Sequence, residues 1–470
     1  MLGGAGLTSV VVMGVRALVL AIVVAAVLGV SGCGGARVSA VPVIVDTDLS
    51  SDDLVALAFL AADPQVDLRA VAVSGTGLVD CPVGARKARE LLALLAHGEV
   101  PVACGTSKPL AGLRSVPEGW RSAADSLFGL TLPPVAAKTN GAAVELIGNA
   151  INGAPAPPTI IELAPMTDLG ALFRSRPGLT TKVRRVIAMA GAVSVPGNAP
   201  EEPRAETNAW IDPLAARIVA ASGVPLTLVP LDATNQVPVT TFLAQALKRY
   251  HYATPEATFV WDLVEATGMD RGGSYFWDPL AASAALDPSL VRTERGRLSV
   301  SRESGVTTVS TGNTATIAVG ADRSKFEQQL LATLLKGAPF TIPADRPDAT
   351  LTLTEKGCNY TGPKQLTAGP IVLDTVNRTA TSFGWVIGHL TGTHTLTDLQ
   401  RYAARLKGPT INAPRWFVGD ANGWPVPPHS RITWQAGLSL SPTGSSNFIC
   451  ATLAPTHIWL PAAIPVFGTR

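Results

Sequence analysis

The sequence predicts an α/β domain, with a mainly parallel open sheet and helices on both faces, followed by an all-β sandwich. The first prediction rests on residues 42–336, where short apolar runs alternate with segments of helical spacing, because that alternation builds a parallel sheet. The second rests on residues 350–470, where short alternating stretches are separated by Gly, Pro, Asn and Thr, as in β-sandwiches. A Pro-rich linker, residues 337–349, joins the two domains.

The elements of each domain follow in chain order. Short apolar runs predict strands at residues 42–46, 66–74, 159–163, 183–190 and 226–231. Apolar residues at three- and four-residue intervals predict helices, here at residues 52–62, 85–97, 167–174, 213–222 and 239–250. The second domain is expected to have strands at residues 350–354, 370–376, 431–440 and 448–453. Because ligands of open parallel sheets bind at the carboxyl ends of the strands, we expect the functional site there.

The composition of the whole chain excludes two classes of protein. Hydrophobic residues make up 47% of the chain and charged residues 15%, which excludes a mainly disordered protein. Lys and Arg number 37 against 35 Asp and Glu, for a net charge of +2. Nucleic-acid-binding proteins usually carry a basic patch or stripe, so we expect no nucleic-acid partner. The composition leaves the oligomeric state open.

Residues 1–32 have the pattern of a secretory signal. Arg16 precedes the apolar run 17–30, which is shorter than the roughly 20 residues of a membrane-spanning helix. Small residues and then Cys33 follow, an order that resembles the bacterial lipobox. The resemblance implies that Cys33 is lipidated and anchors the mature chain to the outer side of the cytoplasmic membrane. An ordinary signal peptide and a single anchor helix are the alternatives.

An extracytoplasmic location allows disulfides, because that compartment is oxidising. Apart from Cys33 the chain has four cysteines, Cys81, Cys104, Cys358 and Cys450, and four cysteines permit three pairings. Proximity within each domain favours Cys81–Cys104 and Cys358–Cys450.

The strongest chemical signal is a cluster of four carboxylates within eight residues, Asp46, Asp48, Asp52 and Asp53. They lie where the first strand ends and the first helix begins. Like charges so close together raise one another's pKa and are costly without a cation. Oxygen ligands suit a hard cation such as Ca²⁺.

The cluster has three other interpretations. An EF-hand loop needs Gly at its sixth position and Glu at its twelfth, where this chain has Ser51 and Leu57. A strand-end Asp-x-Asp also resembles the haloacid-dehalogenase phosphatases, whose first Asp is the nucleophile, but that leaves Asp52 and Asp53 unexplained. A solvated loop before a helix is the third interpretation.

The cluster resembles the first signature of the nucleoside hydrolases (the inosine–uridine-preferring family), Asp-x-Asp-x-x-x-Asp-Asp after the first strand. Four further segments resemble blocks of that family, in the same order. Residues 71–75 with 85–95 resemble its second strand and helix, and residues 163–169 resemble Gly-Pro-Leu-Thr-Asn-Leu. Residues 197–216 resemble Ala-Glu-Phe-Asn followed by Asp-Pro-Glu-Ala-Ala, and residues 277–281 resemble His-Asp-Pro-Leu-Ala. The resemblance covers about residues 42–336 and implies hydrolysis of nucleosides on an open α/β sheet.

The resemblance also implies a metal centre and a general base. Ca²⁺ would be bound by the carboxylates of Asp48, Asp53 and Asp278 and by the backbone carbonyl of Thr167. A cation lowers the pKa of a water beside it, and Asp48 would accept that water's proton. Attack at the anomeric carbon passes through an oxocarbenium-like state, as in glycoside hydrolysis. Asp46 would support the metal ligands without binding the metal itself.

The same resemblance assigns the ribose hydroxyls to four residues, Asp52, Asn198, Glu206 and Asn208. Plainer roles are the alternatives: a turn residue at Asn198, an exposed loop at 206–208 and a helix cap at Asp278. Asp212, which precedes a proline, is expected to cap a helix.

Several positions depart from the family pattern. Leu49-Ser50 replace Pro-Gly in the first signature, which we expect to alter the turn while keeping the carboxylates. Thr76 and Asp168 stand where the family commonly has Asn, and Asn235 stands where it often has His.

The departure with the largest chemical consequence is Trp277, because many members have there a His that protonates the leaving base. An indole cannot donate that proton at ordinary pH. Some purine-selective members resemble this chain in having Trp at that position, and they activate the base by stacking it between aromatic rings. We therefore expect a purine between Trp120 and Trp277. Core packing is the alternative for both tryptophans.

Residues 350–470 weakly resemble cupredoxin-like sandwiches. A blue-copper site takes two His and one Cys, usually with an axial Met. Cys450 has His389, His394 and His457 nearby in sequence, but no Met follows Met269, so a structural cysteine is favoured over copper binding. Four tryptophans of this region are expected to pack in its core or form a binding face, Trp385, Trp416, Trp424 and Trp434.

The sequence therefore predicts a Ca²⁺-dependent, purine-preferring ribonucleoside hydrolase on a lipid-anchored chain. A non-catalytic nucleoside- or sugar-binding lipoprotein on the same fold is the alternative. The changed Thr76 and Trp277 favour that alternative, whereas the retained Asp48, Asp53 and Asp278 argue against it.

Overall fold

The structure, a computed structural model, describes residues 40–112, 114–136, 141–342, 347–363, 366–367, 369–403, 405, 414–426, 428–438, 445–452, 458–459 and 464–467. The predicted signal and Cys33 lie outside the described residues.

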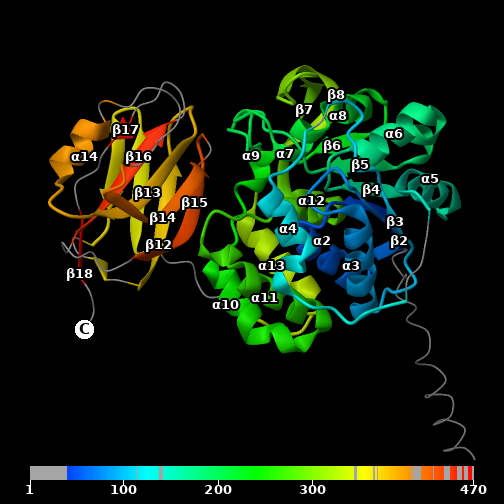
Figure 1. Cartoon of the computed structure of the whole chain (residues 1–470), viewed down its shortest axis with the longest axis horizontal. Helices are drawn as coiled ribbons and strands as arrows, with labels where there is room; N and C mark the ends of the chain where they lie inside the picture. Colours follow the sequence, from blue (N-terminus) through cyan, green and yellow to red (C-terminus); the bar gives the residue numbers. More distant parts are fainter. Residues whose placement is uncertain are drawn as a thin grey trace, which may run out of the picture. The chain divides into compact units, whose positions relative to one another are not determined.

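An eight-stranded sheet forms the centre of the first domain (Figure 1). Its strands are, in spatial order, β3 (Val102–Cys104), β2 (Val66–Val73), β1 (Val41–Thr47), β4 (Thr159–Glu162), β5 (Arg185–Ala188), β6 (Leu226–Leu228), β8 (Thr307–Ala321) and β7 (Val291–Val300). Neighbouring strands are parallel except β7 and β8, which are antiparallel. The chain moves outward from β1 to β3 and then returns to β4 on the other side of β1, so the strand order reverses between β1 and β4. That position is where ligands of open sheets bind.

Helices cover both faces of the sheet because the buried strands are apolar on both sides. In β1, Val43 and Val45 join one core cluster and Ile44 joins the other, as the alternation of strand side chains requires. The first cluster includes residues of α2 (Ser51–Ala62), α3 (Cys81–Leu94), α10 (Thr241–Tyr250), α11 (Pro255–Thr267), α12 (Trp277–Leu286) and α13 (Arg323–Leu334). The second includes residues of α5 (Ala143–Gly153), α6 (Thr167–Ser175) and α8 (Pro213–Ala221).

Short helices complete the domain. They are α4 (Glu118–Asp125), α7 (Thr207–Ile211), α9 (Leu231–Thr234) and the single turns η1 (Leu127–Gly129), η2 (Pro177–Lys182), η3 (His251–Ala253), η4 (Met269–Arg271) and η5 (Pro288–Leu290). Several of them lie in the loops between strands and helices, which carry the residues of the site described below.

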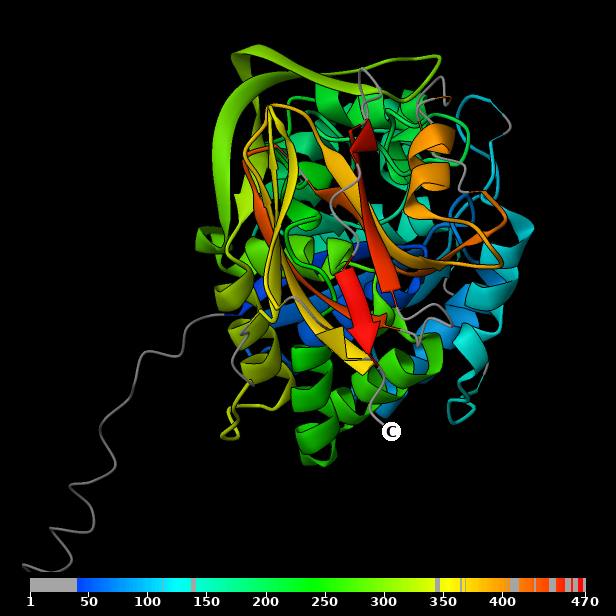
Figure 2. The same ribbon diagram turned by 90° about the vertical axis from the view of Figure 1, so that its left-hand side faces the viewer.

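The predicted α/β domain is confirmed, and each predicted strand and helix has a counterpart. The helix predicted from residue 85 begins at Cys81, because Pro82 is accepted in the first turn. The β7–β8 hairpin was not predicted. Strand β7 and the first half of β8 are mostly exposed and polar, whereas residues 315–321 of β8 form an apolar and largely buried run that the strand prediction overlooked. Figure 2 shows this hairpin, in yellow-green, curving past the other strands of the sheet.

The second domain consists of two packed sheets. One has the order β10 (Gly357–Thr361), β9 (Ala349–Thr354), β12 (Gly369–Asn377), β15 (Arg431–Leu438). The other has the order β11 (Leu366–Thr367), β18 (Ile464–Phe467), β16 (Ser445–Thr452), β13 (Phe383–Leu390), β14 (Phe417–Val426), with β17 (Ile458–Trp459) beside β16. The expected sandwich is therefore present.

The all-β character of this domain needs one correction. Helix α14 (Leu396–Ala403) lies between β13 and β14 in the chain. Its Leu399 is buried in a cluster with Leu390 and Phe417, and its apolar residues recur at helical spacing, a signal that the strand prediction overlooked. Trp385 is buried in the sandwich core, as expected, and Trp416 is half-buried. The side chains of Trp424, Trp434 and Cys450 and the residue His457 lie outside the described part of the chain.

One predicted disulfide is confirmed. Cys81 and Cys104 are bonded, with their Cα atoms 5.4 Å apart, and the bond joins the start of α3 to the end of β3. Cys358 is also disulfide-bonded. Its predicted pairing with Cys450 stays a prediction. No helix in the described part of the chain is long and apolar enough to cross a membrane.

Candidate active site

A cavity of about 420 Å³ is lined by residues that follow the carboxyl ends of three neighbouring strands. Asp48 follows β1, Leu163 follows β4 and Met189 follows β5. Pockets that bind small molecules have volumes of about 300–1,000 Å³ and favour this edge of an open sheet. The cavity contains every residue that the sequence assigned to the substrate and three of the four assigned to the metal: Asp48, Asp52, Asp53, Trp120, Asn198, Glu206, Asn208, Trp277 and Asp278.

The turn after β1 contains a residue in the left-handed backbone conformation. Leu49 has a φ of 55°, which proline, with φ fixed near −65°, could not adopt. Replacement of the family's Pro-Gly by Leu49-Ser50 therefore accompanies a different turn, as expected. Ser50 then caps α2: its hydroxyl accepts the Asp53 N–H at 3.3 Å, and the Asp53 carboxylate accepts the Ser50 N–H at 3.1 Å. The capping box places Asp52 and Asp53 in the first turn of a buried helix.

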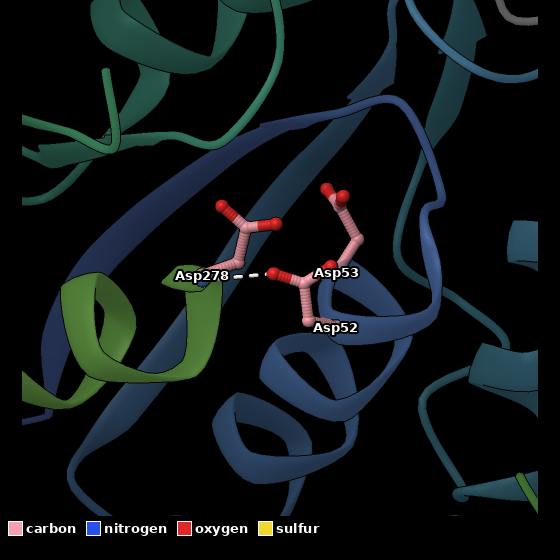
Figure 3. Close-up of side chains that lie close together, drawn as sticks. All are labelled: Asp52, Asp53 and Asp278. Carbon is pink, nitrogen blue, oxygen red and sulfur yellow. Dashed lines mark hydrogen bonds between the residues drawn. The ribbon is translucent and has the colours of Figure 1, made fainter. Parts of the chain in front are cut away.

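Four carboxylates, Asp48, Asp52, Asp53 and Asp278, meet beside this turn, and we refer to them as the carboxylate set. The Asp278 N–H, from the start of α12, donates to Asp52 Oδ2 at 3.2 Å (Figure 3). Asp53 accepts the hydroxyl of Thr47 and, at 3.3 Å, the N–H of Asp48. One carboxylate oxygen from each of Asp52, Asp53 and Asp278 lies within 4.8 Å of the others.

Asp48 lies against a glycine. Its Oδ1 accepts the Ser50 N–H at 3.3 Å. A Cβ at Gly77 would overlap the Asp48 carboxylate, so the close approach of the loop after β2 requires glycine at that position.

Burial raises the pKa of the whole carboxylate set, and neighbouring carboxylates raise most of these values further. The pKa values of Asp48 and Asp278 are raised well above the usual range by burial and then by the charges of Asp53 and Asp52. Burial and Asp53 raise the pKa of Asp52 to about 6, and burial raises that of Asp53. Asp278 Oδ1 is buried and has no hydrogen-bond partner among the described residues. An all-oxygen set of converging carboxylates with an unpartnered oxygen fits a hard divalent cation.

Thr167, the fourth predicted metal ligand, is fully buried at the start of α6 and does not line the cavity. Its hydroxyl donates to Asp212 Oδ2 at 2.8 Å and lies 3.1 Å from the hydroxyl of Thr76. Asp212 caps α8, as predicted, by accepting the Ala215 N–H at 3.1 Å. The contact between Asp212 and Thr167 could not be predicted, because a cap needs only local residues whereas Thr167 lies on another helix.

Asp46 also lies outside the cavity. It pairs in register with Glu162 across β1 and β4, and the side-chain oxygens of both have no hydrogen-bond partner among the described residues. Burial, and then the charge of Asp168, raise the pKa of Asp46 well above its usual range. The structure therefore places Asp46 in a second buried acidic group, and Thr47 rather than Asp46 makes the hydrogen bond to Asp53.

The predicted ribose-binding residues are held by backbone groups. Glu206 caps α7, and its carboxylate accepts the N–H groups of Asn208, Gly191 and Ala209 at 2.8, 3.0 and 3.1 Å. The Asn208 amide donates to the carbonyls of Leu163 and Met189 at 3.0 and 3.1 Å, and it thereby joins the ends of β4 and β5.

Asn198 accepts the N–H and hydroxyl of Thr207 at 2.9 and 3.0 Å. These contacts hold Asn198, which is exposed, to the start of α7. Glu206 and Asn208 are buried, so the alternative of an exposed loop at 206–208 is wrong.

Three aromatic side chains line the cavity, Trp120, Phe128 and Trp277, and we refer to them as the aromatic set. Trp120 lies on α4 and is 44% exposed. Trp277 is half-buried at the start of α12, one residue before Asp278. Phe128 was not predicted, because it lies in the single turn η1 with no motif around it. Among the described residues that line the cavity there is no His, Lys, Arg, Cys or Tyr.

The sequence pattern of the inosine-uridine preferring nucleoside hydrolase family matches residues 43–328. The chain belongs to this family. The match spans the α/β domain and all five sequence blocks noted above, and it gives no support to the phosphatase interpretation. The chain is accordingly a nucleoside hydrolase.

Relatives of known specificity are similar over nearly their whole length. The chain is 32% identical over 317 residues to the pyrimidine-specific ribonucleoside hydrolase RihA of Salmonella schwarzengrund, with 63% of this chain and 99% of that protein covered. It is 31% identical over 324 residues to the protein of the same name from Escherichia coli, with 63% and 99% covered.

Solved structures agree on the fold. A plant nucleoside hydrolase superposes with a TM-score of 0.58 at 27% identity and covers 64% of this chain and 99% of its own. A purine-preferring ribonucleoside hydrolase from Gardnerella vaginalis superposes with a TM-score of 0.54 at 24% identity, with 63% and 98% covered. The second likeness shows the fold alone.

Proposed function

We propose that the chain hydrolyses the N-glycosidic bond of ribonucleosides in a Ca²⁺-dependent reaction, with a preference for purine nucleosides. One observation carries the proposal: a single cavity brings the carboxylate set together with the aromatic set. The carboxylates suit a cation and a water, and the aromatic faces suit a nucleobase.

Asp48, Asp53 and Asp278, with the backbone carbonyl of Thr167, would hold Ca²⁺. The orphan Asp278 Oδ1 and the mutual approach of Asp52, Asp53 and Asp278 support a cation among these residues. When bound, Ca²⁺ supplies a water of lowered pKa. Asp46 is proposed to support the metal ligands indirectly, as a buried carboxyl group on the strand that precedes them, and its side chain makes no hydrogen bond to another described residue.

Asp48 accepts the proton of the attacking water. Burial and then the neighbouring carboxylates raise its pKa, so its ionised form is a stronger base than an exposed carboxylate. Asp52, Asn198, Glu206 and Asn208 bind the ribose hydroxyls. Because their partners are backbone groups of fixed loops, they hold the sugar in one orientation, which lowers the barrier.

The leaving base is activated by stacking. The described lining of the cavity has no side chain that protonates a base near neutral pH apart from the carboxylate set. Trp277 and Trp120 are proposed to hold a purine between their rings, and stacking is worth about 1–3 kcal/mol per base. The relatives named pyrimidine-specific point to the opposite preference. An assay that compares purine with pyrimidine nucleosides is therefore the most informative test.

A nucleoside panel tests the proposal. The protein is assayed with inosine, guanosine, uridine and cytidine in Ca²⁺, in a chelator, and in the chelator after Ca²⁺ is restored. We expect faster cleavage of the purine nucleosides, loss of activity in the chelator and its return with Ca²⁺. Faster cleavage of uridine would overturn the purine preference but would still support the hydrolase activity. No turnover of any nucleoside would support the non-catalytic binding protein instead.

We also propose that the chain is lipid-anchored through Cys33 on the outer side of the cell membrane. The support is the order of charge, apolar run, small residues and cysteine at residues 16–33. Labelled palmitate should be incorporated into the wild type and not into Cys33→Ser. Equal labelling of both would contradict the anchor.

A further inference from the structure

One hydrogen bond fixes the indole of Trp277. Its Nε1–H donates to Oδ1 of Asn235 at 2.9 Å, and Asn235 is only 2% exposed. An indole nitrogen is a donor and never an acceptor, so the amide must present its oxygen. Because Trp277 has one N–H, this contact leaves it none for a ligand.

Asn235 itself is held firmly. It ends α9, where its N–H donates to the Leu231 carbonyl at 3.0 Å. The Leu231 N–H donates to the Gly191 carbonyl at 2.9 Å, and the Asp232 carboxylate accepts the N–H groups of residues 193 and 194 at 2.8 and 2.7 Å. Gly191 also donates to Glu206. Helix α9 therefore ties the proposed ribose-binding loop to Asn235.

The segment after Asn235 runs beside the segment before Trp277. The Phe276 N–H donates to the Val237 carbonyl, and the Val239 N–H donates to the Ser274 carbonyl, both at 2.9 Å. The Tyr275 ring, which is 1% exposed, lies 5.3 Å from the Trp277 ring. Backbone pairing brings the two side chains together, and the amide then selects one orientation of the indole.

We propose that Asn235 is a positioning residue that sets the base preference of the enzyme through Trp277. It holds the indole so that a face of the ring meets the nucleobase, and it occupies the N–H that would otherwise bind a base edge. The enzyme then recognises the base by the area of its ring system rather than by a hydrogen bond from Trp277. Recognition by stacking area favours purines, which have the larger ring system. This inference rests on the proposed function.

Four variants test it. Asn235→Leu removes the acceptor at similar volume, Asn235→Asp keeps an acceptor, Trp277→Phe keeps a ring without an N–H, and the fourth combines Asn235→Leu with Trp277→Phe. Thr234→Val is the matched control, because Thr234 is buried in the same short helix and its hydroxyl donates to the nearby Pro230 carbonyl. All are made in the Asp48→Asn background, so that inosine and uridine affinities are measured by calorimetry without turnover.

Asn235→Leu should weaken inosine binding by about three- to tenfold, the loss typical of one buried hydrogen bond, and weaken uridine binding less. Asn235→Asp should restore most of the affinity and Thr234→Val should not change it. In the Trp277→Phe background, Asn235→Leu should have no further effect. An equal loss in both backgrounds, or no loss in either, would overturn the proposal.

A second measurement does not depend on activity or on inosine. The indole N–H resonance of Trp277 is identified by its disappearance in Trp277→Phe. In Asn235→Leu that resonance should shift and exchange faster with solvent, whereas Thr234→Val should leave it in place. An unchanged resonance in Asn235→Leu would overturn the positioning role. A wild type that turns over no nucleoside but shows the expected affinities and resonances would overturn the proposed function alone.

Discussion

The carboxylate set and the aromatic set share one cavity and are held in place in different ways. The four carboxylates are buried, and backbone N–H groups of residues 48, 50 and 278 donate to them. The aromatic side chains come from three separate segments and range from half-buried to 44% exposed for Trp120. Three of the four carboxylates therefore belong to one rigid turn, and the fourth, Asp278, is tied to that turn by its backbone N–H. Two of the three aromatic side chains, Trp120 and Phe128, lie on segments separate from that turn, whereas Trp277 adjoins Asp278.

The largest effect is expected within the carboxylate set. Asp48→Asn removes the proposed general base at nearly constant volume, so kcat should fall by about 10²–10⁴-fold. Nucleoside turnover and thermal unfolding of the same preparation measure the loss of activity and the integrity of the fold.

The control for Asp48→Asn is Asp287→Asn, a half-buried cap outside the cavity, which should keep its activity. If Asp48→Asn retained more than about a tenth of the activity, general-base catalysis by Asp48 would be wrong and another group would have to accept the proton.

The contrast between the two sets also explains what the sequence could predict. Three of the four carboxylates lie within six residues where a buried strand meets a helix, so their density identifies the site without a structure. A role for Trp277 could be predicted only because it precedes Asp278 in the block 277–281, which resembles a motif of the family. Phe128 lies in an isolated turn, and no local pattern marks it.

Two hydrogen bonds between distant segments could not be predicted. Asp212 was correctly placed as a cap, but its bond to the Thr167 hydroxyl joins two helices. Asn235 stood out only as a departure from the family, and its partner 42 residues away is set by the pairing of segments 237–239 and 274–276. Periodicity reports which face of an element is buried and does not report which polar groups meet across elements.

The next largest effect is expected in the aromatic set. Trp277→Ala should lower kcat/KM for inosine by about 5- to 150-fold, since stacking is worth about 1–3 kcal/mol per base, and Trp277→Phe should lower it less. Trp120→Ala should cost less than Trp277→Ala, because an exposed ring excludes less water from the base.

The comparison needs uridine measured alongside inosine. Both alanine variants should lose more activity toward inosine than toward uridine, while Trp261→Phe, outside the cavity, should not alter the ratio. A uniform loss for both nucleosides would mean that the aromatic set maintains the fold of the cavity and does not select the base.

The smallest effect is one of stability and returns to the carboxylate set. In a chelator the folded pKa of Asp52 is about 6 against an ordinary value of 3.8, so the folded state binds this proton more tightly than the unfolded state. The contribution of Asp52 to stability is then fully present below about pH 4 and is lost as the pH rises through about 6.

The free energy of unfolding in a chelator should fall by about 1–3 kcal/mol between pH 5 and pH 7.5 relative to the same measurement in Ca²⁺, because the cation stabilises the charged form of the carboxylates. Asp52→Asn should reduce this difference, and the neighbouring carboxylates, whose pKa values are also raised, should account for what is left. A chelated protein that gained stability relative to the Ca²⁺ form as the pH rose would show that the carboxylates are not paired with a cation in the folded state, and the rigid turn would then need another explanation than metal binding.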